Sequence, residues 1–273
     1  MRTFGWVHHL VFGMIVGLLL ALLPVRDARA MHDQVHCRSC HRMDARAENG
    51  VVKALRVPRK TLCLTCHDAR QDVSGMGPPH VINGSRPLAG GSFTATLDSD
   101  NSGHNMLSVD ADLGLTPPGG SPRSEFSCLS CHDPHPNGNF RNLKTEINGR
   151  GTWISAHGDA SFEKNVYISG INNFCSACHP QFAEPSTGSN GNSWRRHPVG
   201  ITIYGAQHAD FIHWAKSRNK ITLAEFPAGD PDTAAGARVF CLSCHVAHAS
   251  PFQDALRWDY AQTPRGCLEC HSF

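Results

Sequence analysis

The chain has 273 residues, of which 12 are Cys, 18 are His, 25 are Gly and 17 are Pro, and only 18% are charged. A formal net charge of +2 argues against a protein whose main partner is nucleic acid. Apolar residues are scattered singly among the glycines and prolines, without amphipathic helices or alternating strands, which argues against an ordinary enzyme scaffold with a parallel sheet. Something other than aliphatic side chains must therefore fill the interior.

Residues 1–30 have the features of a secretory signal peptide. A basic residue is followed by an apolar run over residues 11–23, and Ala28 and Ala30 occupy the −3 and −1 positions of a cleavage site. The apolar run is shorter than a membrane-spanning helix requires, and a signal anchor is the alternative. We therefore expect an exported protein with a mature region over residues 31–273 and no membrane span after cleavage.

All twelve cysteines belong to six copies of one motif, Cys-x-x-Cys-His. Disulfide scaffolds are common among exported chains, and zinc sites also use paired cysteines. Neither requires a histidine after every second cysteine, whereas the attachment of c-type haem does. The predicted attachment residues are Cys37 and Cys40, Cys63 and Cys66, Cys128 and Cys131, Cys175 and Cys178, Cys241 and Cys244, and Cys267 and Cys270.

The motif spacing matches the chemistry of haem attachment. On one helical turn, positions i, i+3 and i+4 share a face, so two thiols and one imidazole can meet one porphyrin. The thiols form thioethers and the imidazole becomes the proximal iron ligand. We expect one elongated multihaem cytochrome domain over residues 31–273, with short α-helices at the motifs, little β structure, irregular chain elsewhere, and six haems as its core. The predicted proximal ligands are His41, His67, His132, His179, His245 and His271.

The second axial ligand decides what such haems do, because a second imidazole closes the iron and suits it to electron transfer. The mature region has ten further histidines for six irons, and a methionine ligand at one haem is the alternative. The histidines that we predict as distal ligands are His80, His104, His135, His197 and His248, with His32 or His36 as the sixth, and His157, His208 and His213 as further candidates.

Two parts of the chain repeat the same order of residues. A histidine, His104 or His197, precedes a CLSCHxxH segment whose last residue is His135 or His248, as expected for a repeated structural unit. This last histidine lies too close to its own motif to reach the far face of its own haem, so we expect it to ligate a neighbouring haem. By order along the chain, we assign His104 to the third haem, His135 to the fourth and His248 to the sixth. His197 is assigned to the fourth or fifth haem.

The stretches between motifs are rich in turn-forming residues. Residues 74–125 and 180–200 are predicted to be loops that wrap the haem edges. A short strand over residues 201–205 and a short helix over residues 209–220 are the exceptions that the pattern indicates.

Several segments resemble the OmcS-type outer-surface hexahaem cytochromes of metal-reducing bacteria. These are CLSCHDPH, GHNM, FCSACH followed by RHPVG, and CLSCHVAHASPF followed by LRWD. The resemblance covers the mature region motif by motif, with shorter stretches between motifs. It implies bis-His haems in a continuous stack, and subunits that polymerise into extracellular nanowires and export electrons to minerals or partner cells. It also implies a histidine that links one subunit to a haem of the next; Asp44 stands at that position, and His32 and His36 are the nearest substitutes.

We therefore expect extracellular electron transfer rather than enzymatic catalysis. The predicted protein is an extracellular or cell-surface filament subunit that associates head-to-tail and has redox partner cytochromes and extracellular acceptors. A non-polymerising periplasmic or surface carrier is the alternative. A multihaem reductase of a small oxyanion is a third hypothesis, disfavoured because all six motifs keep their histidine and distal candidates exceed the number of irons.

Overall fold

The computed structural model describes residues 32, 35–42, 55–57, 59–72, 74, 77–86, 88–93, 102–104, 116–123, 126–158, 165–183, 199–203, 223–229 and 236–262. Several sequence predictions lie outside these residues: the signal peptide, the helix over residues 209–220, the sixth motif with Cys267, Cys270 and His271, and the candidates His197, His208 and His213. Within the described residues, no helix is long and apolar enough to cross a membrane.

Short helices form at the motifs. They are α2 (Cys37–Cys40), α4 (Leu64–His67), α5 (Cys128–Cys131) and α9 (Cys241–Cys244), while α6 (Ile171–Ser176) contains the first cysteine of the fourth motif. Two further turns, α3 (Arg59–Leu62) and α7 (Pro180–Ala183), flank motifs. In all five described motifs the backbone N–H of the histidine donates to the carbonyl oxygen of the first cysteine, at 2.8–3.1 Å. This i to i−4 bond closes one helical turn around each attachment site.

β structure is confined to two small antiparallel pairs in the described chain. Strand β1 (Glu146–Ile147) pairs with β2 (Arg150–Gly151), and β3 (Ser155–His157) pairs with β4 (Val166–Ser169). Asn148 and Gly149 form the turn between β1 and β2, with φ of 54° and 75°. An Asn-Gly pair with positive φ suits a two-residue hairpin turn. The strand predicted over residues 201–205 is only a bridge between Thr202 and Arg238 in the part that is described.

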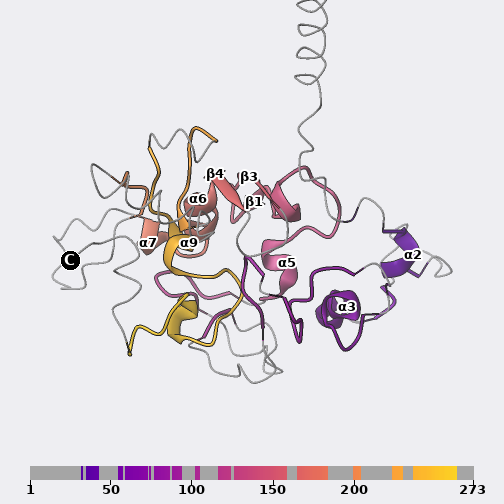
Figure 1. The fold of residues 1–273 in the computed structure, drawn as a ribbon. Coiled ribbons are helices and arrows are strands. Elements are labelled where there is room, and N and C mark those ends of the chain that lie inside the picture. The colour runs from indigo at the N-terminus through magenta and orange to yellow at the C-terminus, as the bar shows by residue number, and fades with distance from the viewer. Residues whose placement is uncertain are drawn as a thin grey trace, which may run out of the picture.

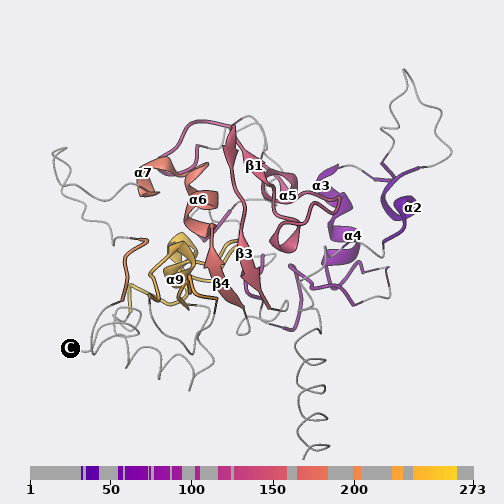
Figure 2. The same ribbon diagram turned by 90° about the horizontal axis from the view of Figure 1, so that it is seen from above.

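The motif helices follow one another across the molecule in chain order. Figure 2 shows α2 at one side, then α3 with α4, then α5, and finally α6 and α9, and Figure 1 shows the same order for α2, α3, α5, α6 and α9. Strands β1, β3 and β4 lie between α5 and α6 (Figure 1 and Figure 2). The fold therefore arranges the five described motifs as a row.

The apolar core of the described chain is divided into small clusters. The larger one joins the third, fourth and fifth motifs and contains Phe140, Ile154, Tyr167, Ile171, Phe240 and Leu242, with Cys175 and Cys241 packed against it. A second cluster contains Ile82, Phe93 and Ala249. Each cluster packs between motifs, so the apolar side chains position the motifs.

The third and fifth motifs begin a repeated unit, residues 128–143 and 241–256. After each motif the chain passes through a 3-10 turn, η2 (Phe140–Asn142) or η4 (Gln253–Ala255), and returns as an antiparallel bridge beside the proximal histidine. The middle residues of these turns, Arg141 and Asp254, have φ of 54° and 57°. The self-similarity seen in the sequence thus corresponds to two copies of one local structure of equal length.

Candidate haem sites

Cysteines of successive motifs lie beside one another. The Cys63 thiol donates to Cys128, and the Cys175 thiol donates to Cys241. Cys40 lies close enough to Cys66, and Cys131 close enough to Cys178, for each pair of thiols to interact electrostatically. None of the ten described cysteines is in a disulfide. The sites on either side of each contact are therefore adjacent.

A zinc centre requires three or four ligands around one point. Among the described residues, no group of three or more His, Cys, Asp or Glu side chains is placed to hold a metal ion. Burial raises the pKa of the Cys131 thiol to about 12, and the neighbouring Cys178 adds to this rise. The described motifs therefore present separate pairs of thiols, most of them partly buried.

Four of the five described proximal histidines face a second imidazole. The two ring centroids are 6.1–6.2 Å apart in every case. An imidazole nitrogen binds a metal at about 2.0 Å and lies about 1.1–1.2 Å from its ring centroid, so two imidazoles on opposite sides of one iron have centroids about 6.2–6.4 Å apart. The pairs are His41 with His135, His67 with His32, His132 with His248, and His179 with His104. These residues therefore fit bis-imidazole ligation of a haem iron.

The backbone holds the ring nitrogen that would not bind the iron. In six of these eight histidines, and in the remaining proximal histidine His245, Nδ1–H donates to a carbonyl oxygen at 2.7–3.1 Å, which leaves Nε2 for a metal. The acceptors are Pro134 for His32, Pro79 for His67, Ala247 for His104, Arg141 for His132, Pro118 for His179, Asp254 for His245 and Gly91 for His248. One ring orientation is thus built into the chain at each of these positions.

Sequence reasoning missed these carbonyl acceptors. The backbone atoms of Arg141 and Asp254 hold His132 and His245, at the same position of the two repeated units. Their positive φ turns each carbonyl group toward the imidazole. The sequence signal that could have indicated these acceptors is the equal length of the two units, because it places both acceptors nine residues after their histidines.

Burial also prepares the imidazoles electrostatically. It lowers the pKa of His67, His104 and His132, and it lowers the pKa of His248 to about 4. A neutral imidazole is the form that binds a metal. These side chains are therefore ready to ligate iron at neutral pH.

Buried polar atoms near the motifs have no hydrogen-bond partner within the described residues. They include Nδ1 of His41, Nε of Arg123, the side-chain amide of Asn142 and Nε1 of Trp258. Such atoms in a native protein call for a ligand or water that the chain itself does not supply. Their presence is consistent with a polar prosthetic group at these sites.

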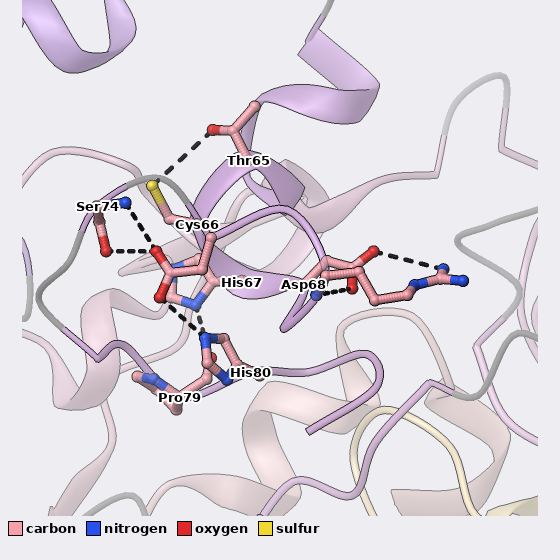
Figure 3. A network of polar contacts seen from close by, with 9 residues as sticks. Thr65, Cys66, His67, Asp68, Ser74, Pro79 and His80 are labelled. Atoms are coloured by element: carbon pink, nitrogen blue, oxygen red, sulfur yellow. Dashed lines mark hydrogen bonds and ion pairs between the residues drawn. The ribbon is translucent and has the colours of Figure 1, made fainter. Parts of the chain in front are cut away.

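His80 has a different partner from the other predicted distal ligands. Its Nε2 lies 3.0 Å from Oδ2 of Asp72, whose Oδ1 also accepts from the backbone and hydroxyl of Ser74 (Figure 3). Hydrogen bonds from Ser74 and His80 lower the pKa of the Asp72 carboxyl to about 2. The preceding residue, Pro79, is the one that accepts from His67 (Figure 3). His80 therefore lies beside the second site with its Nε2 directed to a carboxylate.

The observed pairs differ from the assignment by chain order. His104 faces the fourth motif, His135 the first and His248 the third, whereas chain order predicts the third, fourth and sixth. The reason is that the stacking of the repeated units, not distance along the chain, decides which imidazole reaches each site.

The two N-terminal candidates have different surroundings. His32 faces His67 of its own chain, so the expectation that it links to another subunit is not supported by its position. His36 is exposed and immediately precedes α2. His157 is exposed in β3, and no imidazole of the described residues is paired with it.

Known proteins resemble this chain in sequence and in fold. Residues 233–273 match the family described as doubled CXXCH motif. C-type cytochrome OmcS of Geobacter sulfurreducens is 25% identical over 251 residues, a match that covers 61% of this chain and spans 57% of that relative. The solved structure titled Outer Membrane Cytochrome S Filament from Geobacter sulfurreducens superposes with a TM-score of 0.52 at 19% identity, over 86% of this chain and 85% of that one. The chain is similar to OmcS-type multihaem cytochromes.

The OmcS-like fold confirms the predicted fold class, with few short helices, little strand and mostly irregular chain. The motifs and the similarity to OmcS together support covalent c-type haem as the cofactor. The resemblance that the motifs indicate is thus found in both sequence and fold.

Proposed function

We propose that this chain transfers electrons through six covalently attached c-type haems, each held between two histidines. The observation that carries the proposal is the constant separation of 6.1–6.2 Å in four imidazole pairs, one at each of the first four motifs. Bound haem supplies a reversible one-electron couple, and two imidazole ligands leave no open position for a substrate. Electron transfer is therefore favoured over reduction of a small oxyanion.

The four pairs follow a rule with a period of two motifs. A distal histidine that follows its motif, His135 or His248, faces the proximal histidine two motifs earlier. A distal histidine that precedes its motif, His32 or His104, faces the proximal histidine of the next motif. The segments around the first, third and fifth motifs thus supply ligands to other sites, which ties those sites together.

The same rule assigns the remaining ligands. His197 precedes the fifth motif, so we assign it to the sixth haem, opposite His271. The rule gives His245, the proximal histidine of the fifth motif, no distal ligand from its own chain. We propose that the N-terminal segment of a second copy supplies this ligand. His36 is the described histidine that fits this role, because His32 already faces an imidazole of its own chain.

A ligand given by one copy to the next is a head-to-tail contact, which propagates into an open filament unless its rotation closes a ring. The similar solved structure is itself a filament, which supports this assembly. With the predicted signal peptide, we propose an extracellular or cell-surface filament that receives electrons from partner cytochromes and delivers them to extracellular acceptors. A periplasmic carrier that does not polymerise is the second candidate.

Electron microscopy of the purified protein separates these two candidates. We expect filaments from wild-type protein whose intact mass equals residues 31–273 plus six haems. His36→Ala is expected to abolish filaments without loss of haem, because it removes the ligand given to the next copy. Arg38→Ala, a change at an exposed neighbour in α2, is the control and keeps the filaments.

Two outcomes would contradict this assembly. Single particles from fully loaded wild-type protein would favour the carrier. Filaments with six low-spin haems from His36→Ala would show that another residue makes the link.

A further inference from the structure

Arg123 lies between the third and fourth motifs, with its guanidinium held from two sides. Its Nη1 donates to Sγ of Cys178 at 3.3 Å and to Oδ1 of Asn148 at 3.1 Å. The Asn148 amide in turn donates to the carbonyl oxygen of Ala177 at 2.7 Å. Asn148 has a φ of 54° in the β1–β2 turn, a left-handed conformation that asparagine adopts more readily than most residues. The hairpin therefore clamps the guanidinium onto a sulfur atom of the fourth motif.

The segment that carries Arg123 fits closely against the same motif. The carbonyl oxygen of Pro118 accepts from Nδ1 of His179 at 2.9 Å. A Cβ atom at Gly120 would lie 2.1 Å from the carbonyl oxygen of Cys178, so the close approach requires glycine. The contacts that orient the proximal imidazole of the fourth motif thus also fix the position of the charge.

No carboxylate of the described residues forms an ion pair with Arg123. Its Nε is buried and has no hydrogen-bond partner there. The charge also reaches the third motif: burial and Cys178 raise the pKa of Cys131, and Arg123 opposes that rise. Since a guanidinium does not lose its proton in proteins, a positive charge without a carboxylate partner among the described residues is held where the third and fourth motifs meet.

We propose that the positive charge of Arg123 raises the reduction potential of the haems at the third and fourth motifs. This inference rests on the proposed function, because it requires haem at both motifs. One electron from a mediator converts one ferric haem to the ferrous form, with no bond made or broken, and makes that site one charge more negative. A nearby positive charge stabilises the reduced state, so this part of the row holds electrons more strongly than it would without Arg123.

A mediated redox titration of the haem-loaded protein tests this proposal with four variants. Arg123→Gln removes the charge, Arg123→Lys keeps it, and Asn148→Asp places a compensating negative charge beside it. Arg86→Gln removes an exposed arginine and is the matched control for loss of one surface charge. Intact mass of each variant establishes that the haems are present before the titration.

We expect Arg123→Gln and Asn148→Asp to lower the ratio of reduced to oxidised haem at one or two sites by about three- to tenfold at a fixed applied potential. This change in the ratio corresponds to a reduction potential that is lower by about 28–59 mV for a one-electron couple. We expect the redox titration curve of Arg123→Lys to lie close to that of the wild type, and the curve of Arg86→Gln to superimpose on it.

Three results would overturn the role of Arg123. One is a fully loaded Arg123→Gln protein that titrates as wild type, and another is an equal shift from Arg86→Gln. If Arg123→Gln does not fold, an unchanged curve from Asn148→Asp is the third. A protein whose mass shows no haem would instead overturn the proposed function, so the two failures are distinguishable.

Discussion

Replacing His248 by alanine is expected to convert one haem, that of the third motif, from low-spin to high-spin. The His248 ring faces His132 with centroids 6.2 Å apart, and its Nδ1 is held by the carbonyl oxygen of Gly91 at 3.1 Å. Phe93 stacks on the same ring at 5.1 Å. No other imidazole of the described residues is paired with His132, so its removal opens a coordination position. Electron paramagnetic resonance of the oxidised protein measures the resulting high-spin ferric signal.

His80→Ala provides the contrast to this result. Its Nε2 is directed to Asp72, and the proximal histidine beside it, His67, faces His32. We therefore expect His80→Ala to add no high-spin signal, although the sequence alone predicts His80 as a distal ligand. A high-spin haem from His80→Ala together with an unchanged spectrum from His248→Ala would contradict the pairing.

Phe240→Ala is expected to lower the free energy of unfolding by about 3–5 kcal/mol, the usual cost of truncating a fully buried aromatic residue. The Phe240 side chain is 1% exposed and its ring lies 5.2 Å from that of Tyr167. It directly precedes Cys241 and packs in the cluster that joins the fifth motif to α6. Denaturant unfolding followed by haem absorbance measures the change.

Tyr260→Ala is the matched control for this truncation. The Tyr260 side chain is 67% exposed, so its loss is expected to change the free energy of unfolding by less than about 0.5 kcal/mol. Equal destabilisation by the two substitutions would show that the cluster around Phe240 does not hold the motifs together.

The helical turns at the motifs could be predicted from the sequence because their structure is local. The N–H of His132 bonds to the carbonyl oxygen of Cys128, and all the groups of that turn lie within five consecutive residues. The pairing of imidazoles is not local. His132 and His248 belong to motifs separated by more than a hundred residues, and no local pattern between them predicts how the two units stack.

The supporting backbone was also beyond sequence reasoning. Arg141 adopts a positive φ, which is uncommon for arginine, so its residue type gave no sign of the turn that it forms. Asp254 adopts the same conformation, which aspartate tolerates better, but its residue type alone does not specify the turn. The clamp of Asn148 on Arg123 likewise depends on a hairpin of two-residue strands, too short for an alternating pattern to predict. The apolar cluster around Phe240 could not be predicted either, because its members are scattered singly along the chain.

A high-resolution density map of the haem-loaded protein tests the central claim most directly. We expect an iron midway between His132 and His248, with thioether density from Cys128 and Cys131 to the same porphyrin. The same arrangement is expected at the other three imidazole pairs. Disulfides between the motif cysteines, zinc in place of haem, or an iron whose two faces carry other ligands than these pairs would contradict the account.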